Sequence, residues 1–158
     1  MQRVDLNAET AAMGFSYRAA ALIVQDGKLL VARHVDYDCY YTIGGGVLLH
    51  ETSGEAAVRE ALEETGHLFE IDRLAFVNER FYMQRGRRRH ELAFYYLMKP
   101  PVHLQIAEGA YTDQGRAETL HWLPIDGLSE VNLVPDFLKA RLPKLGSAME
   151  HVITRECE

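Results

Sequence analysis

The chain has 158 residues, of which 47% are hydrophobic, and this length and composition suit one domain spanning residues 1–158. Its formal net charge of −6 argues against a general polyanion binder, so no nucleic-acid partner is expected. No apolar run approaches the ~18 residues of a membrane span. The N-terminus lacks a basic start followed by an apolar stretch, so we expect neither membrane insertion nor a secretory signal.

The first predicted elements are two strands, 19–24 and 29–33, joined by a tight turn. Asp26 and Gly27 lie between these two apolar runs, and an Asp-Gly pair in that position is typical of a β-hairpin. The segment 43–47 is interpreted as the end of a strand that leads into a loop. Its three consecutive glycines allow the backbone to approach a ligand closely.

A helix is predicted over 55–64, directly after this loop. Thr52 and Glu55 have the spacing of a capping box, no Pro or Gly interrupts the segment, and Gly66 follows as a stop signal. Four apolar residues recur at helical spacing and form the predicted buried face: Ala57, Val58, Ala61 and Leu62.

Three carboxylates of this helix, Glu60, Glu63 and Glu64, lie off the apolar face. Residues three and four positions apart share one face of a helix, and like charges there destabilise an isolated helix by roughly 0.2–0.5 kcal/mol per pair. An isolated pair of this kind is usually a solvated surface feature. The fixed offsets of all three from Gly45 and Glu51 instead favour a site for a hard divalent cation with oxygen ligands.

The C-terminal half predicts three more strands and a second helix. Segments 74–81 and 92–98 are predicted strands around a basic loop, and 118–123 is a later strand. A helix is predicted over 134–142, because Pro135 lies near its start. The predicted order is therefore two strands, a helix, three strands and a helix.

Residues 45–67 resemble the Nudix box, whose pattern is Gly, five residues, Glu, seven residues, Arg-Glu-U-x-Glu-Glu-x-Gly-U, with U a bulky aliphatic residue. Ala61 and His67 depart from U, and the small Ala61 indicates tight packing of the helix on a sheet. The resemblance implies an α/β fold of the α+β type, with a mixed β-sheet sandwiched between helices. Every fixed position is matched, by Gly45, Glu51, Arg59, Glu60, Glu63, Glu64 and Gly66.

The resemblance also implies an enzyme, a Nudix pyrophosphohydrolase acting on phosphoric anhydride bonds. Such a hydrolase cleaves the diphosphate linkage of a nucleoside diphosphate joined to another moiety, as in a nucleoside triphosphate or a nucleotide sugar. Its implied cofactor is Mg²⁺ or Mn²⁺, and its partner is that small molecule, with homodimer formation left open. By resemblance, Glu60, Glu63, Glu64 and a carbonyl near Gly45 are the metal ligands, and Arg59 orients the carboxylates.

Residues around the box receive supporting roles by the same resemblance. Glu51 and Gly46 help to hold the loop. The arginines Arg87, Arg88 and Arg89 are candidate ligands of substrate phosphates, because arginine binds phosphate through paired hydrogen bonds. The alternative is that they lie in a solvated hairpin loop. An additional general base outside the box has four candidates, Glu91, Glu108, Asp113 and Glu118.

Two other functions are weighed against hydrolysis. One is a Nudix-like domain that senses a nucleotide without cleaving it, although such domains commonly lose the box carboxylates that this chain keeps. The other is an isoprenoid diphosphate isomerase, which needs a catalytic cysteine, whereas Cys39 lies in no such motif and is expected to be a packed thiol. With Cys157 it makes only two thiols, which indicates a reducing cytoplasm.

Overall fold

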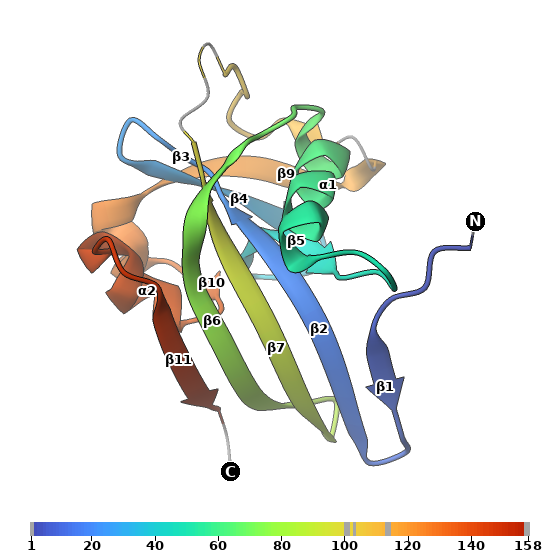
Figure 1. Cartoon of the computed structure of the whole chain (residues 1–158). Coiled ribbons are helices and arrows are strands. Elements are labelled where there is room, and N and C mark those ends of the chain that lie inside the picture. The colour runs from blue at the N-terminus through green and yellow to red at the C-terminus, as the bar shows by residue number, and fades with distance from the viewer. Residues whose placement is uncertain (1, 100–101, 103, 113–114, 157–158) are drawn as a thin grey trace.

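A mixed β-sheet forms the centre of the molecule, as Figure 1 shows. The computed structural model describes residues 2–99, 102, 104–112 and 115–156. The strand order is β11-β6-β7-β2-β5-β4-β9-β8, while β1, β3 and β10 pair with β2, β4 and β5. The strands are β1 (Asn7–Glu9), β2 (Met13–Leu22), β3 (Val24–Gln25), β4 (Lys28–His34), β5 (Tyr40–Gly46), β6 (Ile71–Gln84), β7 (Arg87–Met98), β8 (Tyr111–Thr112), β9 (Gly115–Pro124), β10 (Leu133–Val134) and β11 (Glu150–Arg155).

Helices lie on both faces of this sheet (Figure 1). One face carries α1 (Ser53–Thr65), and the other carries η1 (Ile125–Glu130), α2 (Phe137–Arg141) and η2 (Leu142–Lys144). Strand β2 runs parallel to β7 and antiparallel to β5, so the sheet is mixed. The predicted fold class is therefore confirmed.

The continuous apolar run of β2 is explained by burial on both faces. Ala19 and Ala21 pack in the cluster that includes α1, whereas Ala20 and Leu22 pack in the cluster that includes α2. Successive side chains of a strand point to opposite faces, and a strand covered on both sides needs apolar residues at every position. This double burial fixes the position of β2, which is the strand that supports the box loop on β5.

The predicted helix and hairpin are confirmed, with one error on the helix face. Thr52 and Glu55 form the capping box of α1, and Gly66 ends the helix with a φ of 75°. Asp26 and Gly27 have positive φ in the β3–β4 turn, as a two-residue hairpin requires. The assignment of Leu62 to the buried face is wrong, because its side chain is 42% exposed.

Other segments differ from prediction at their ends. Strands β6 and β7 extend to a turn at Arg85 and Gly86, so residues 87–89 belong to β7 and not to a loop. The second helix is shorter than predicted, because Val134 belongs to β10 and Pro143 lacks the amide hydrogen that a continued α-helix needs. Strands β1 and β11 were not predicted. Among the described residues, no helix is long and apolar enough to cross a membrane.

Adjacent positions in α1 offer a direct test of this packing. Ala61 is fully buried against the sheet, so Ala61→Leu should lower the free energy of unfolding by about 1–3 kcal/mol through overpacking. Leu62→Ala, at the next position, should change it by less than about 0.5 kcal/mol, because this side chain is partly in solvent. Urea unfolding of both variants measures the difference, and equal losses would contradict the helix orientation.

Candidate active site

The box loop and the box helix meet at the glycines that end β5. A side chain at Gly45 would overlap the Glu60 carboxylate, so any larger residue at this position would displace that carboxylate. Gly45 pairs with Ala19 of β2, which anchors the loop to the middle of the sheet. The predicted proximity of Gly45 and Glu60 therefore follows from direct packing.

Arg59 is the centre of a hydrogen-bond network that joins the helix to the loop. Its Nε and Nη2 atoms donate to the two Glu51 carboxylate oxygens at 2.6 and 3.0 Å. Nη1 donates to Glu60 at 2.6 Å and to Glu63 at 3.3 Å. Nη2 also donates to the Gly46 carbonyl at 2.9 Å. Arg59 thus holds three box carboxylates and the loop in one arrangement.

The charges in this network reinforce one another. The hydrogen bond from Arg59 is the main reason that the pKa of Glu51 lies below its usual range, and the Leu48 amide adds to the effect. The same contact raises the pKa of Arg59, which stays protonated. Arg3 contributes a second cation, 2.7 Å from Glu63. Glu51 is therefore the ion-pair partner of Arg59 and accepts a hydrogen bond from the Leu48 amide, while its supporting role stays a prediction.

Glu64 has a different environment from the other box carboxylates. It is buried and accepts a hydrogen bond from the Gly44 amide at 3.0 Å. Burial is the main reason that the pKa of Glu64 is raised to about 8. The Gly44 amide acts in the opposite direction, and the negative charges of Glu118 and Glu60 raise the pKa by smaller amounts than burial does. A buried carboxylate near other carboxylates is stabilised as an anion only when a cation comes close.

The residues present fit a divalent cation by their chemistry. Magnesium prefers carboxylate and carbonyl oxygens, and Glu60, Glu63, Glu64 and the loop around Gly45 supply these groups from two adjoining elements. Among the described residues, no three His, Cys, Asp or Glu side chains are already gathered as a metal site. Glu60 and Glu63 instead contact the guanidinium group of Arg59.

The candidate bases outside the box lie in different places. Glu118 on β9 lies near the box, since its negative charge raises the pKa of both Tyr41 on β5 and Glu64 on α1. Glu91 on β7 is buried, with its Oε2 atom 3.7 Å from the Nε atom of Arg18.

Glu108 forms hydrogen bonds with β9 and not with the box residues. Its two carboxylate oxygens contact His121 Nδ1 at 2.5 Å and the Trp122 amide at 2.8 Å, so it fastens its loop to β9. Asp113 lies outside the described residues.

The predicted basic loop is replaced by a strand with its arginines on alternating faces. Arg87 and Arg89 both form ion pairs with Glu9 of β1, at 2.6 and 2.5 Å, while Arg88 lies between them and is exposed. Arg87 and Arg89 therefore share the single negative charge of Glu9, and the three arginines with Glu9 keep a net positive charge. Their role as phosphate ligands stays a prediction. Glu9 was not identified from the sequence, because no local pattern links it to residues about eighty positions away.

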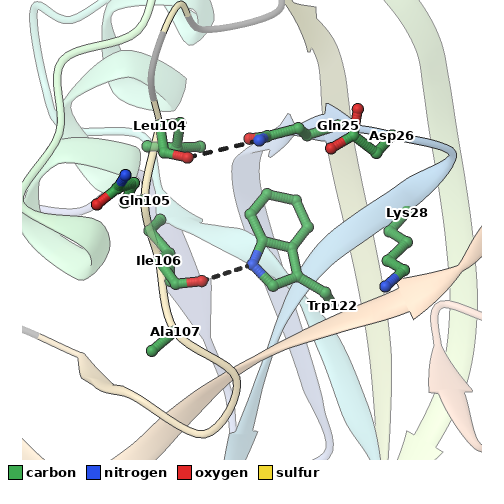
Figure 2. A pocket seen from close by; sticks show the side chains of 8 residues that line it. All are labelled: Gln25, Asp26, Lys28, Leu104, Gln105, Ile106, Ala107 and Trp122. Carbon is green, nitrogen blue, oxygen red and sulfur yellow. Dashed lines mark hydrogen bonds between the residues drawn. The ribbon is translucent and has the colours of Figure 1, made fainter.

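A cavity of about 540 Å³ lies away from the box, between the β3–β4 hairpin and residues 104–107 (Figure 2). The indole of Trp122 forms one wall and donates a hydrogen bond to the Ile106 carbonyl at 2.9 Å. Its charged lining residues are Asp26 and Lys28, and it contains none of the predicted site residues. This cavity therefore does not carry the box chemistry.

The comparison with protein families agrees with the geometry of the box. Residues 16–143 match the family model described as the NUDIX domain, which covers most of the chain. The chain therefore belongs to the Nudix family, whose members are pyrophosphohydrolases that act on small nucleotide derivatives and generally need a divalent metal. The family predicted from the sequence is confirmed.

One relative is similar to this chain in sequence. It is 29% identical over 112 residues to a MutT-like protein of Streptomyces ambofaciens, covering 71% of this chain and 65% of that protein. The chain thus spans just under two thirds of that relative's length.

Two solved structures share the fold. A MutT protein from Bacillus halodurans gives a TM-score of 0.66 at 14% identity, covering 89% of each chain. A UDP-X diphosphatase gives 0.59 at 21% identity, covering 92% of this chain and 68% of that one.

The buried charge of Glu64 predicts a pH-dependent stability. Because the folded-state pKa is raised above the usual value of 4.5, the folded protein binds this proton more tightly than the unfolded chain. The stability linked to the proton is present below pH 4.5 and is lost as the pH rises to about 8. Glu64→Gln, measured in EDTA, should therefore stabilise the protein increasingly over this window, by at most about 1.4 kcal/mol per pH unit.

Urea unfolding between pH 5 and 9 measures this effect. Glu130→Gln, at an exposed position in η1, controls for the loss of one carboxylate. A stability difference between Glu64→Gln and the native protein that stays constant over the whole range would contradict the burial argument.

Proposed function

We propose that this protein is a metal-dependent Nudix hydrolase that cleaves the diphosphate linkage of a nucleoside diphosphate joined to another moiety. The observation that supports this most directly is the carboxylate cluster of α1 held against the glycine loop by Arg59. The family of the chain and the MutT-like relative agree with such an activity. The cofactor proposed is Mg²⁺, with Mn²⁺ as a substitute.

In this proposal Glu60, Glu63 and Glu64 hold the metal, together with a loop carbonyl near Gly45. A bound divalent ion would neutralise charge on the substrate phosphates and lower the pKa of a bound water. Arg59 is proposed to position these carboxylates, because its contact with Glu51 is independent of the metal ligands. The protein's contribution is then mainly positioning and electrostatics, as in other phosphoryl transfers.

For the general base, we propose Glu118 ahead of Glu91. Glu118 lies on the box side of β9 and interacts electrostatically with Glu64. Its charge also raises the pKa of Tyr41 on β5, so Glu118 lies close to the strand that carries the box loop. Glu108 is a weaker candidate, because both of its oxygens are already engaged by β9.

The remaining assignments extend the same proposal to the whole chain. Residues 1–158 are proposed to form one domain, since both β1 and β11 join the central sheet. A cytoplasmic location and a homodimer are compatible with it. The partly buried thiol of Cys39 is free. A nucleotide-sensing role stays the alternative to hydrolysis, and turnover assays distinguish the two.

The metal requirement is tested by turnover of a nucleotide panel with products identified by mass. Hydrolysis should need Mg²⁺ or Mn²⁺ and should stop in excess EDTA. Glu63→Gln should lower kcat by at least about 100-fold while the fold persists, because it removes one charged oxygen ligand. Glu70→Gln, an exposed carboxylate after the helix, serves as the matched control and should be unaffected. Full turnover in EDTA would refute the metal proposal.

The proposed base has its own test. Glu118→Gln should reduce kcat by about 10²- to 10⁴-fold with little change in KM, the range for loss of a positioned base. Glu108→Gln should keep most of the activity. If Glu91→Gln is the variant that loses kcat and Glu118→Gln is not, the assignment belongs to β7 instead of β9.

A further inference from the structure

A small polar cavity of about 280 Å³ opens beside the box loop. Gly46 lines it, and the Gly46 carbonyl is also the acceptor of the Arg59 hydrogen bond. Arg18, which pairs with Gly46 across β2 and β5, lies next along the wall. The cavity therefore borders the box loop at Gly46.

The walls of this cavity come from the sheet and from the N-terminal segment. Ser16 and Arg18 of β2 point to the same sheet face as Ala20, which is the face opposite α1. Glu91 stands opposite Ser16 on the neighbouring strand β7. Asn7 of β1 pairs with Ser16 and closes one side. Residues 5–7 lie before the segment matched by the family model.

The lining supplies many hydrogen-bonding groups and little apolar surface. Carboxylates accept hydrogen bonds, guanidinium groups donate them, and amides and hydroxyls do both. The ring of Tyr82 adds a flat surface to this set. Apart from the tyrosines, the polar residues are Asp5, Asn7, Ser16, Arg18, Gln84, Arg89 and Glu91.

The charges of the cavity disfavour another phosphate. Arg18 lies beside Glu91 at 3.7 Å, and Arg89 is bound to Glu9 at 2.5 Å, so both cations already have carboxylate partners. Asp5 adds a further negative charge. A polyphosphate chain would displace existing ion pairs and meet carboxylates. A neutral group with many hydroxyls would find donors and acceptors without that cost.

We propose that this cavity binds the sugar of a nucleotide-sugar substrate, a proposal that rests on the proposed function above. Water would add to one phosphorus of the diphosphate and the bridging P–O bond would break. The oxygen of the water would stay on the attacked phosphorus, and the bridging oxygen would leave with the other phosphate. The products above neutral pH would be a nucleoside monophosphate dianion, a sugar phosphate dianion and two protons. The size of the cavity allows one sugar ring.

Two variants and a control test the cavity. Ser16→Leu fills it, and Asn7→Ala removes an exposed polar wall group with less risk to the fold. Ser129→Leu, on η1, adds the same side chain at an exposed site away from the box. Circular dichroism and thermal unfolding first establish that each variant is folded.

The first measurement is steady-state kinetics with Mg²⁺ on UDP-glucose, ADP-ribose and GDP-mannose against the nucleoside triphosphates. The native protein should have its highest kcat/KM on one of the three nucleotide sugars. For that substrate, Ser16→Leu should raise KM at least about tenfold, and Asn7→Ala should raise it at least about threefold. Both variants should keep kcat within about twofold of the native value, because binding would be lost equally in the ground state and the transition state. Ser129→Leu should match the native protein.

The second measurement is saturation-transfer NMR of the same nucleotide sugars in EDTA, which needs no turnover. Sugar protons should receive saturation from the native protein and lose it in Ser16→Leu. Preference for a triphosphate would overturn the sugar site while the proposed hydrolase function stands. Absence of turnover would refute the hydrolase, and the NMR result would then decide the sugar site alone. If Ser16→Leu leaves the saturation of the sugar protons unchanged, the proposed sugar site is wrong.

Discussion

The arrangement of this molecule depends on keeping several carboxylates close together on one side of α1. Arg59 reduces the repulsion between these carboxylates, because it forms ion pairs with Glu51, Glu60 and Glu63 at once. Glu64 is left without a cation in hydrogen-bond range among the described residues, and burial keeps its pKa near 8. The cluster is therefore held in position but is not fully neutralised, which is the state expected of a site that gains stability from a metal ion.

The rest of the fold supplies the rigid frame that this cluster needs. Burial of β2 on both faces fixes the strand against which the box glycines pack, and the Thr52 capping box fixes where α1 begins. Because Gly45 leaves room for Glu60, the helix approaches the strand closely. On the opposite face, the same strand pair carries Arg18 beside Gly46, so the metal site and the proposed sugar site share one support.

Local patterns in the sequence were enough to predict the box helix, its caps and the β3–β4 turn, because each depends on residues within a few positions. They failed where pairing over long distances decides the structure. Arg87 and Arg89 were assigned to a loop, since nothing near them shows that Glu9 of β1 is their partner. The candidate bases were also inseparable, because only the folded sheet brings Glu118 toward Glu64 and fastens Glu108 to His121.

The most direct test of the account is calorimetric titration of Mn²⁺ into the protein at pH 7 in buffers of different ionisation enthalpy. A metal ligand must be deprotonated, so a Glu64 with a pKa of about 8 must release its proton when Mn²⁺ binds. The account predicts release of about one proton per Mn²⁺ by the native protein and almost none by Glu64→Gln. Binding without proton release by the native protein would contradict it.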